Sequence, residues 1–160
     1  AVKFPGGPHA PMTLPDQDDN PDTLDILFYD NNIVITRGNE EVSEEYSRAV
    51  QYRINEKEKT VNEVWSYGEE RGSALFSSIV GDADYLHDTG NRLLTSGYIE
   101  VDEDENARNS RVIEVSDETP ANVIFEIVIS GFDQGSHRQA YRAERLLLYP
   151  EQQWDFEIRK

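Results

Sequence analysis

Two neighbouring stretches decide the fold: Ser47-Arg48-Ala49-Val50-Gln51-Tyr52-Arg53-Ile54 and Thr60-Val61-Asn62-Glu63-Val64-Trp65-Ser66-Tyr67. Both alternate in period two, the period with which side chains of a β-strand point to opposite faces of a sheet. Residues 55–59 between them are charged or polar and suit a hairpin loop. The two stretches therefore predict an antiparallel hairpin.

The same pattern recurs further along the chain. Ser47-Arg48 matches Ser110-Arg111 at an offset of 63, and Val61 and Trp65 match Val123 and Ile127 at an offset of 62. A supersecondary unit that repeats at a nearly fixed period is typical of repeat architectures. We therefore predict two copies of one four-stranded module.

Apolar runs supply the remaining strands of each module. Residues 24–29 form a run that ends at the turn residues Asp30-Asn31-Asn32, and residues 84–86 lead through a turn at 88–91 into the apolar run 92–98. The predicted fold is all-β, with four-stranded antiparallel units over about residues 11–67 and 81–130. A closing segment covers residues 137–154, for which a strand is favoured over a helix because of Pro150.

Repeated four-stranded modules are typical of β-propeller blades, although this period is long for a blade and implies inserted loops. Two blades cannot close a ring. The sequence therefore favours a propeller fragment that lacks several preceding blades, and a two-sheet sandwich is the alternative. The two units leave an apolar edge open, which offers a surface for dimerisation or strand exchange.

Composition excludes several classes of function. The chain has 160 residues, enough for one domain, and a formal charge of −17 that repels nucleic acid and anionic membranes. It has no cysteine, which excludes thiolate metal sites and cysteine nucleophiles. No apolar run approaches the roughly 20 residues that a membrane-spanning helix needs. The first residues lack a signal-peptide pattern, and a start without Met suits a processed protein or an excised fragment.

Residues 4–11, with three prolines and two glycines around His9, predict a rigidly bent loop. Taken alone, His9 is better explained as a turn residue near a chain terminus than as a catalytic residue. His87 and His137 lie in turn and loop contexts and are expected to be exposed. The acidic stretches 16–20 and 102–106 lack the spacing of an EF-hand and are interpreted as solvated loops, so no metal site is predicted.

Several linked strings resemble one family. Gly7-Pro8-His9 precedes Phe28-Tyr29-Asp30-Asn31, then come Tyr46 to Ile54 and Thr60 to Gly68 with Glu70-Arg71-Gly72, followed by the blade pattern at residues 81–86 and 90–94 and by Tyr141 to Arg145. In this order and spacing they resemble the C-terminal part of the bacterial arylsulfate sulfotransferases. The resemblance extends over nearly the whole chain.

The resemblance implies a six-bladed propeller that moves a sulfuryl group from a phenolic sulfate ester to a phenol acceptor through a sulfated histidine. The family's nucleophile falls on His9, and its further histidines and an arginine would lie upstream. The resemblance also implies an extracytoplasmic location and no cofactor, and the chain by itself is expected to be inactive. The alternative is a non-catalytic propeller or sandwich module that binds a protein or glycan at the cell surface.

The arginines have structural interpretations. Arg48 and Arg111 occupy equivalent repeat positions, which favours a structural role between strands over sulfate binding. Arg142 and Arg145 flank Glu144 and are interpreted as an ion-paired face. The predicted site therefore contains His9 alone.

Overall fold

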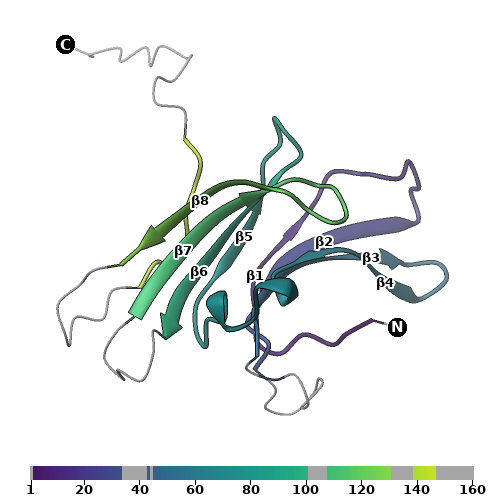
Figure 1. Ribbon diagram of the computed structural model, residues 1–160. Helices are drawn as coiled ribbons and strands as arrows, with labels where there is room; N and C mark the ends of the chain where they lie inside the picture. The colour runs from purple at the N-terminus through teal and green to yellow at the C-terminus, as the bar shows by residue number, and fades with distance from the viewer. Residues whose placement is uncertain (1, 34–42, 44, 101–107, 131–138, 147–160) are drawn as a thin grey trace, which may run out of the picture.

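The computed structural model describes residues 2–33, 43, 45–100, 108–130 and 139–146. Its strands form two four-stranded antiparallel sheets (Figure 1), which confirms the predicted all-β fold. The first sheet contains β1 (Pro8–Thr13), β2 (Thr23–Asp30), β3 (Arg48–Asn55) and β4 (Thr60–Tyr67). The second contains β5 (Asp82–Tyr85), β6 (Arg92–Glu100), β7 (Arg108–Val115) and β8 (Val123–Ile129). A short 3-10 helix, η2 (Glu69–Ala74), connects the sheets.

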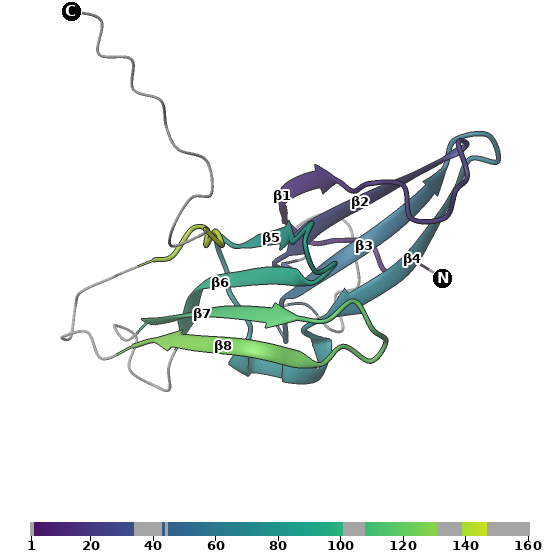
Figure 2. The ribbon, with the colours of Figure 1, turned by 90° about the horizontal axis from the view of Figure 1, so that it is seen from above.

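Each sheet is a meander in which consecutive strands are neighbours. The sheets meet along their first strands, because β5 contacts both β1 and β2. From that line β3 and β4 extend to one side and β7 and β8 to the other, as the view from above shows (Figure 2). β1 and β5 are therefore the innermost strands of two fanned sheets.

The core fills the space between the sheets. The first sheet contributes a face that includes Leu27, Tyr29 and Trp65, and the second contributes Leu94 and Ile113, all at most 5% exposed. Burying an apolar side chain of this size stabilises the fold by about 1.5–3 kcal/mol relative to leaving it exposed. The two sheets are thus held face to face by the alternate residues that the period-two pattern places inward.

Hydrogen bonds show that the two sheets are copies. The Ser47 hydroxyl donates to the Asn31 carbonyl at 3.2 Å, and the Ser110 hydroxyl donates to the Gly97 carbonyl at 2.9 Å. Each serine oxygen also accepts a backbone N–H from the segment after the fourth strand, Ser77 at 2.9 Å and Ala140 at 3.3 Å. The predicted equivalence of Ser47 and Ser110 is confirmed.

The register corrects the predicted alignment of the last strands. Tyr67 lies opposite Ala49, and Ile127 lies opposite Val112, the equivalent of Ala49, so Ile127 corresponds to Tyr67 and not to Trp65. The reason is that the connection between the third and fourth strands is three residues shorter in the second sheet, so the third strands match at an offset of 63 and the fourth strands at an offset of 60. The β-bulges themselves fall at equivalent places, after Gln51 and after Glu114.

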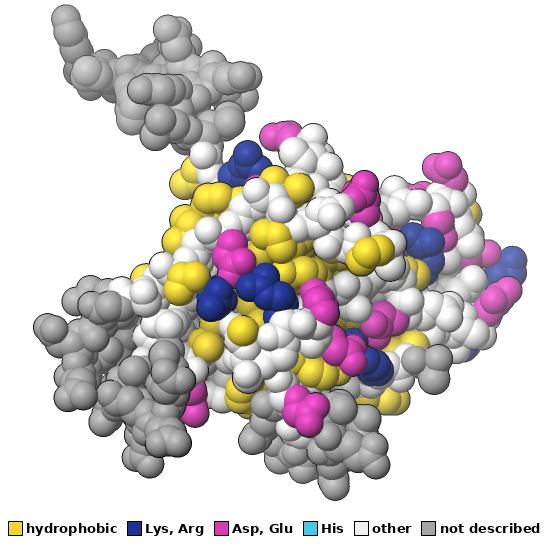
Figure 3. All heavy atoms as spheres, in the orientation of Figure 1, with side chains coloured by type: hydrophobic (Ala, Val, Ile, Leu, Met, Phe, Trp, Pro, Cys, Tyr) yellow, Lys and Arg dark blue, Asp and Glu magenta, His cyan; other side chains and the backbone are white. Residues whose placement is uncertain are grey.

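The second sheet has an open outer face. Hydrophobic side chains are exposed over it (Figure 3), including Phe125 at 46% and Ile127 at 44%. The corresponding outer face of the first sheet is covered, because Val2 packs on Phe28, Val50 and Tyr52. A large exposed apolar face on a sheet usually marks a contact with another protein surface.

The predicted closing strand is not formed where the structure describes it. Residues 139–146 are neither helix nor strand, and the rest of the segment lies outside the described residues. Within the described parts of the chain, no helix has the length and apolar character that spanning a membrane requires.

Candidate functional site

His9 lies in a strand and not in the predicted bent loop. β1 begins at Pro8, and His9 pairs directly with Tyr29 of β2. A β-bulge follows, with Ala10 at a φ of 49°, before pairing resumes at Met12. Directly paired residues point to the same face of a sheet, so His9 and Tyr29 both face the second sheet. The half-buried imidazole therefore sits on the innermost edge strand, beside the line where the sheets meet.

The buried carboxylate of Asp30 fixes the chain segment that leads to His9. Asp30 accepts hydrogen bonds from the Gly6 backbone N–H at 2.8 Å, the Asn32 backbone N–H at 3.0 Å and Arg48 Nε at 3.1 Å. Asp30 and Arg48 are almost fully buried, and Arg48 also reaches Glu63 at 3.0 Å. A charge-assisted network of this kind is rigid because every alternative leaves a buried charge unpaired.

Segment 77–81 lies across from the first sheet and packs against it. The buried Asn31 side chain donates to the Ser77 carbonyl at 2.6 Å and to the Val80 carbonyl at 2.9 Å. Val80 has a φ of 55°, a strained conformation for a β-branched residue, and Gly81 has a φ of 144°. A Cβ at Gly81 would collide with the Tyr29 ring. The backbone at Gly81 therefore packs against the residue that is paired with His9.

Tyr29 is held neutral at the centre of this arrangement. Its hydroxyl lies 2.6 Å from Ser96 Oγ, and burial raises the pKa of Tyr29 to about 12. A phenol with such a pKa stays protonated near neutral pH. Tyr29 is thus a positioning residue between His9 and segment 77–81.

The second sheet carries a polar group in the matching place. Asp82 begins β5, is 1% exposed, and pairs with Thr95, which is fully buried. Arg142 Nε donates to Asp82 Oδ2 at 3.1 Å. Burial and, next, the charge of Asp84 raise the pKa of Asp82, whereas Arg142 lowers it. The innermost strands therefore each carry a titratable side chain near their start, His9 as the second residue of β1 and Asp82 as the first residue of β5.

The arginines serve structural contacts, as predicted for two of them. Arg48 pairs with Asp30 and Glu63, and Arg111 pairs with Glu126 on the neighbouring strand. The predicted ion pairing of Arg142 and Arg145 is confirmed, and it extends beyond Glu144. Arg142 contacts Glu144 only at 3.5 Å, and the closer ion pairs of both arginines reach buried acids on the second sheet, Arg142 to Asp82 at 3.1 Å and Arg145 to Glu114 at 2.7 Å.

The acidic loop at residues 16–20 uses its oxygens internally. Asp16 accepts the backbone N–H groups of Asp18 and Asp19, and Asp18 accepts the Thr23 hydroxyl and pairs with Arg53. No cluster of three or more metal-ligating side chains occurs in the described part of the chain. The stretch 102–106 lies outside the described residues.

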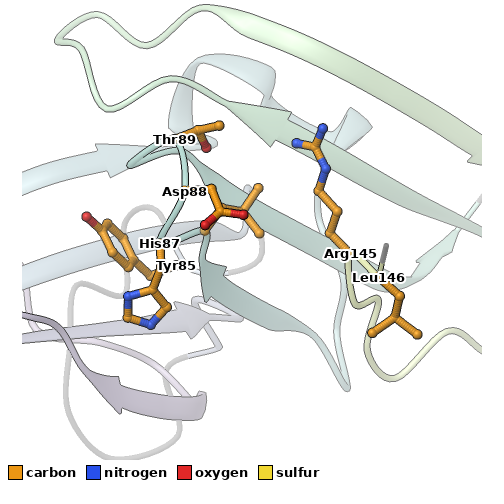
Figure 4. A pocket seen from close by; sticks show the side chains of 7 residues that line it. Tyr85, His87, Asp88, Thr89, Arg145 and Leu146 are labelled. Carbon is orange, nitrogen blue, oxygen red and sulfur yellow. The ribbon is translucent and has the colours of Figure 1, made fainter. Parts of the chain in front are cut away.

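A hollow of about 380 Å³ lies between the β5–β6 turn and the end of the described chain. Figure 4 shows Tyr85, His87, Asp88 and Thr89 across from Arg145 and Leu146. His87 is exposed, as predicted, and stands edge-on to the Tyr85 ring at 5.1 Å. His137 lies outside the described residues. His9 is not among the residues that line this hollow.

The sequence singles out His9 as a candidate, which stays a prediction, and does not reveal the groups around it. Asp30 and Asn31 are predicted only as a turn, yet Asp30 anchors the His9 segment and Asn31 anchors segment 77–81. Asp82 carried no signal beyond a common Gly-Asp string. The internal repeat could have identified it, because β1 and β5 occupy the same place in their sheets.

Comparisons with known proteins identify the family of this chain. A family model described as arylsulfotransferase (ASST) matches residues 1–142. The arylsulfate sulfotransferase AssT of Lelliottia amnigena is 34% identical over 110 residues, which cover 69% of this chain and 18% of that protein. The AssT of Escherichia coli O6:H1 (strain CFT073) is 49% identical over 43 residues, 27% of this chain and 7% of that protein. The matched part is thus less than a fifth of either relative's length. Because the family model covers most of its residues, the chain belongs to the arylsulfotransferase family.

Proposed function

We propose that this chain is the C-terminal part of an arylsulfate sulfotransferase that transfers a sulfuryl group from a phenolic sulfate ester to a phenol, with His9 as the residue that is transiently sulfated. The observation that carries the proposal is the family match over residues 1–142, which includes a half-buried histidine on an innermost strand. The relatives are named as arylsulfate sulfotransferases, and this chain spans only part of them.

His9 suits nucleophilic attack on sulfur. The neutral ring nitrogen attacks sulfur, the S–O bond to the phenol breaks, and phenolate leaves with the electron pair. A phenol then attacks the sulfated histidine and restores the free ring. Asp30 supports this by fixing the backbone before His9, and Asn31 by fixing segment 77–81 against the end of β2.

In the propeller ring of the longer protein, this chain supplies two blades. The outer face of the second sheet repeats the residue positions with which the first sheet meets the second, since Phe125 and Ile127 take the places of Trp65 and Tyr67. Such a face fits a further blade, which supports a six-bladed propeller in the longer protein. The family's remaining histidines and its arginine then come from blades upstream. An extracytoplasmic location belongs to the same proposal.

The test uses the full-length protein that contains this chain. We expect His9→Asn to lower release of nitrophenol from 4-nitrophenyl sulfate by about 10³-fold or more, because the covalent route is lost. His87→Asn serves as the matched control and keeps near-normal turnover. Near-normal turnover in His9→Asn would overturn the assignment, and a full-length protein with no turnover at all favours a non-catalytic binding module.

A further inference from the structure

The segment that follows each sheet is held by the same hydrogen bond. The Ser47 hydroxyl oxygen accepts the Ser77 backbone N–H at 2.9 Å, and the Ser110 hydroxyl oxygen accepts the Ala140 backbone N–H at 3.3 Å. Ser47 and Ser110 are 63 positions apart, and so are Ser77 and Ala140. The segment after β8 therefore continues the repeat in register with the segment after β4.

The same offset points to a further innermost strand after the second sheet. β5 (Asp82–Tyr85) matches residues 145–148, which are one arginine and three leucines. Pro150 matches His87, which lies in the turn after β5, so the proline falls beyond the matched strand. By their place in the repeat, residues 145–148 correspond to the innermost strand of a third unit.

Apolar side chains around this position are exposed where their counterparts are buried. Ala83 of β5 is fully buried between the sheets, whereas Leu146, which matches it, is 80% exposed. On the outer face of the second sheet, Phe125 holds the place of Trp65 and is 46% exposed, against 5% for Trp65. Exposed apolar groups on both the segment and the sheet indicate a missing partner layer.

The segment already runs along the outer face of the second sheet. Arg142 Nε donates to Oδ2 of the buried Asp82 at 3.1 Å. Residues 143–145 line a groove of about 430 Å³ together with apolar side chains that include Phe125 and Ile127. The segment therefore leads directly to the exposed apolar face.

Strand pairing for this segment has to come from outside the chain. A β-strand needs a neighbouring strand for its backbone hydrogen bonds. The described strands all belong to the two sheets, and none of them pairs with Arg145 or Leu146. The Lelliottia amnigena relative is matched over only 18% of its length, so a longer protein of this family has further chain that can supply strands.

We propose that residues 145–148 form the innermost strand of a third blade, whose remaining strands come from an upstream part of the longer polypeptide. The segment pairs with the open edge of that blade, as an extended peptide adds to a sheet edge, and the blade covers the outer face of the second sheet. Leu146 then faces the second sheet, as Ala83 faces the first. The inference rests on the propeller arrangement in the proposed function and is independent of its sulfuryl chemistry.

Hydrogen exchange of the full-length protein tests the pairing. We expect every second amide of residues 145–148 to be protected at least about 10²-fold more than in the isolated 160-residue chain, because only the full-length protein supplies the partner strands. Equal protection in the two proteins overturns the inference.

Two substitutions in the full-length protein test the register. Leu146→Asp puts a charge in the place of the buried Ala83 and is expected to lower the protection of residues 145–148 by at least about tenfold. Leu147→Asp is the matched control, because β5 already has Asp84 in that place, and it is expected to leave the protection unchanged. Equal effects of the two substitutions overturn the proposed register.

Release of nitrophenol from 4-nitrophenyl sulfate, measured on the same preparation, separates this inference from the proposed function. Protection of the segment without turnover supports the third blade and refutes the sulfotransferase assignment. Turnover without protection overturns the third blade alone.

Discussion

At the scale of the residue, the account depends on a few buried polar side chains that each hold two segments together. Asp30 joins the segment before His9 to β3 through Gly6 and Arg48. Asn31 joins the end of β2 to segment 77–81. Neither contact is local in sequence, so together they fix the chain segments around His9 relative to one another.

We expect Asp30→Asn to lower the free energy of unfolding by about 3–5 kcal/mol, because it breaks a buried ion pair and leaves Arg48 undercompensated. Urea denaturation of the isolated chain measures this. Asp22→Asn, which removes only the exposed pair with Lys57, is expected to cost less than about 1 kcal/mol. Equal midpoints for the two variants would contradict the role given to Asp30.

Tyr29 gives a prediction about pH. Its folded pKa of about 12 exceeds the ordinary tyrosine pKa of 10.0, so the folded state retains the proton to higher pH than the unfolded chain. Stability is therefore expected to fall as pH rises from 10 to 12, and Tyr29→Phe should reduce that slope. At pH 7 the variant costs about 1–3 kcal/mol because Ser96 loses its partner. An unchanged alkaline slope in thermal unfolding would refute the assignment.

At the scale of the element, the strands followed from period-two alternation and from turn residues, whereas the irregular parts did not. The predicted loop around His9 is instead part of β1, which has a β-bulge between His9 and Met12. Pro8 and Pro11 are tolerated there because β1 is an edge strand, with one neighbour within its sheet. Asp82 could not be found from local sequence, since its partner Arg142 lies 60 residues further along the chain.

Gly97 tests how segment 139–146 is attached. A Cβ at Gly97 would collide with the Ala140 carbonyl, so Gly97→Ala is expected to displace this segment from the second sheet. Hydrogen exchange at the Ala140 amide, which bonds to Gly97, should then accelerate by at least about tenfold. Gly72→Ala strains the backbone, because Gly72 has a φ of 54°, but its Cβ meets nothing within 4 Å, so it controls for a destabilising Gly→Ala change without a collision at Ala140. Unchanged protection of Ala140 in Gly97→Ala would contradict this attachment.

At the scale of the whole molecule, two sheets fan out from one line and leave one outer face of the second sheet open. The net charge of −17 opposes association, while the exposed apolar side chains favour it. The all-β class and the two sheets were predictable from the repeat. That a face stays open could be predicted only from the presence of just two units. Which face it is could not be predicted, because the pattern of a single sheet does not show which side lacks a partner.

We expect the isolated chain to self-associate through this face at high salt, where charge repulsion is screened. Ile127→Glu places a charge on the face and should shift the chain to monomer in sedimentation velocity. Val64→Glu, at a similarly exposed position on the first sheet, is the control and should still associate. A wild-type chain that stays monomeric at all concentrations would argue against an interface there.

The central claim is that His9 carries the sulfuryl group, and mass spectrometry tests it most directly. The full-length protein is mixed with 4-nitrophenyl sulfate in the absence of acceptor, quenched under alkaline conditions and digested. The account predicts that the peptide containing His9 gains the mass of one sulfuryl group, that the fragment ions place it on His9, and that added phenol removes it. A stable adduct on any other residue, or turnover with no adduct on His9, would contradict the account.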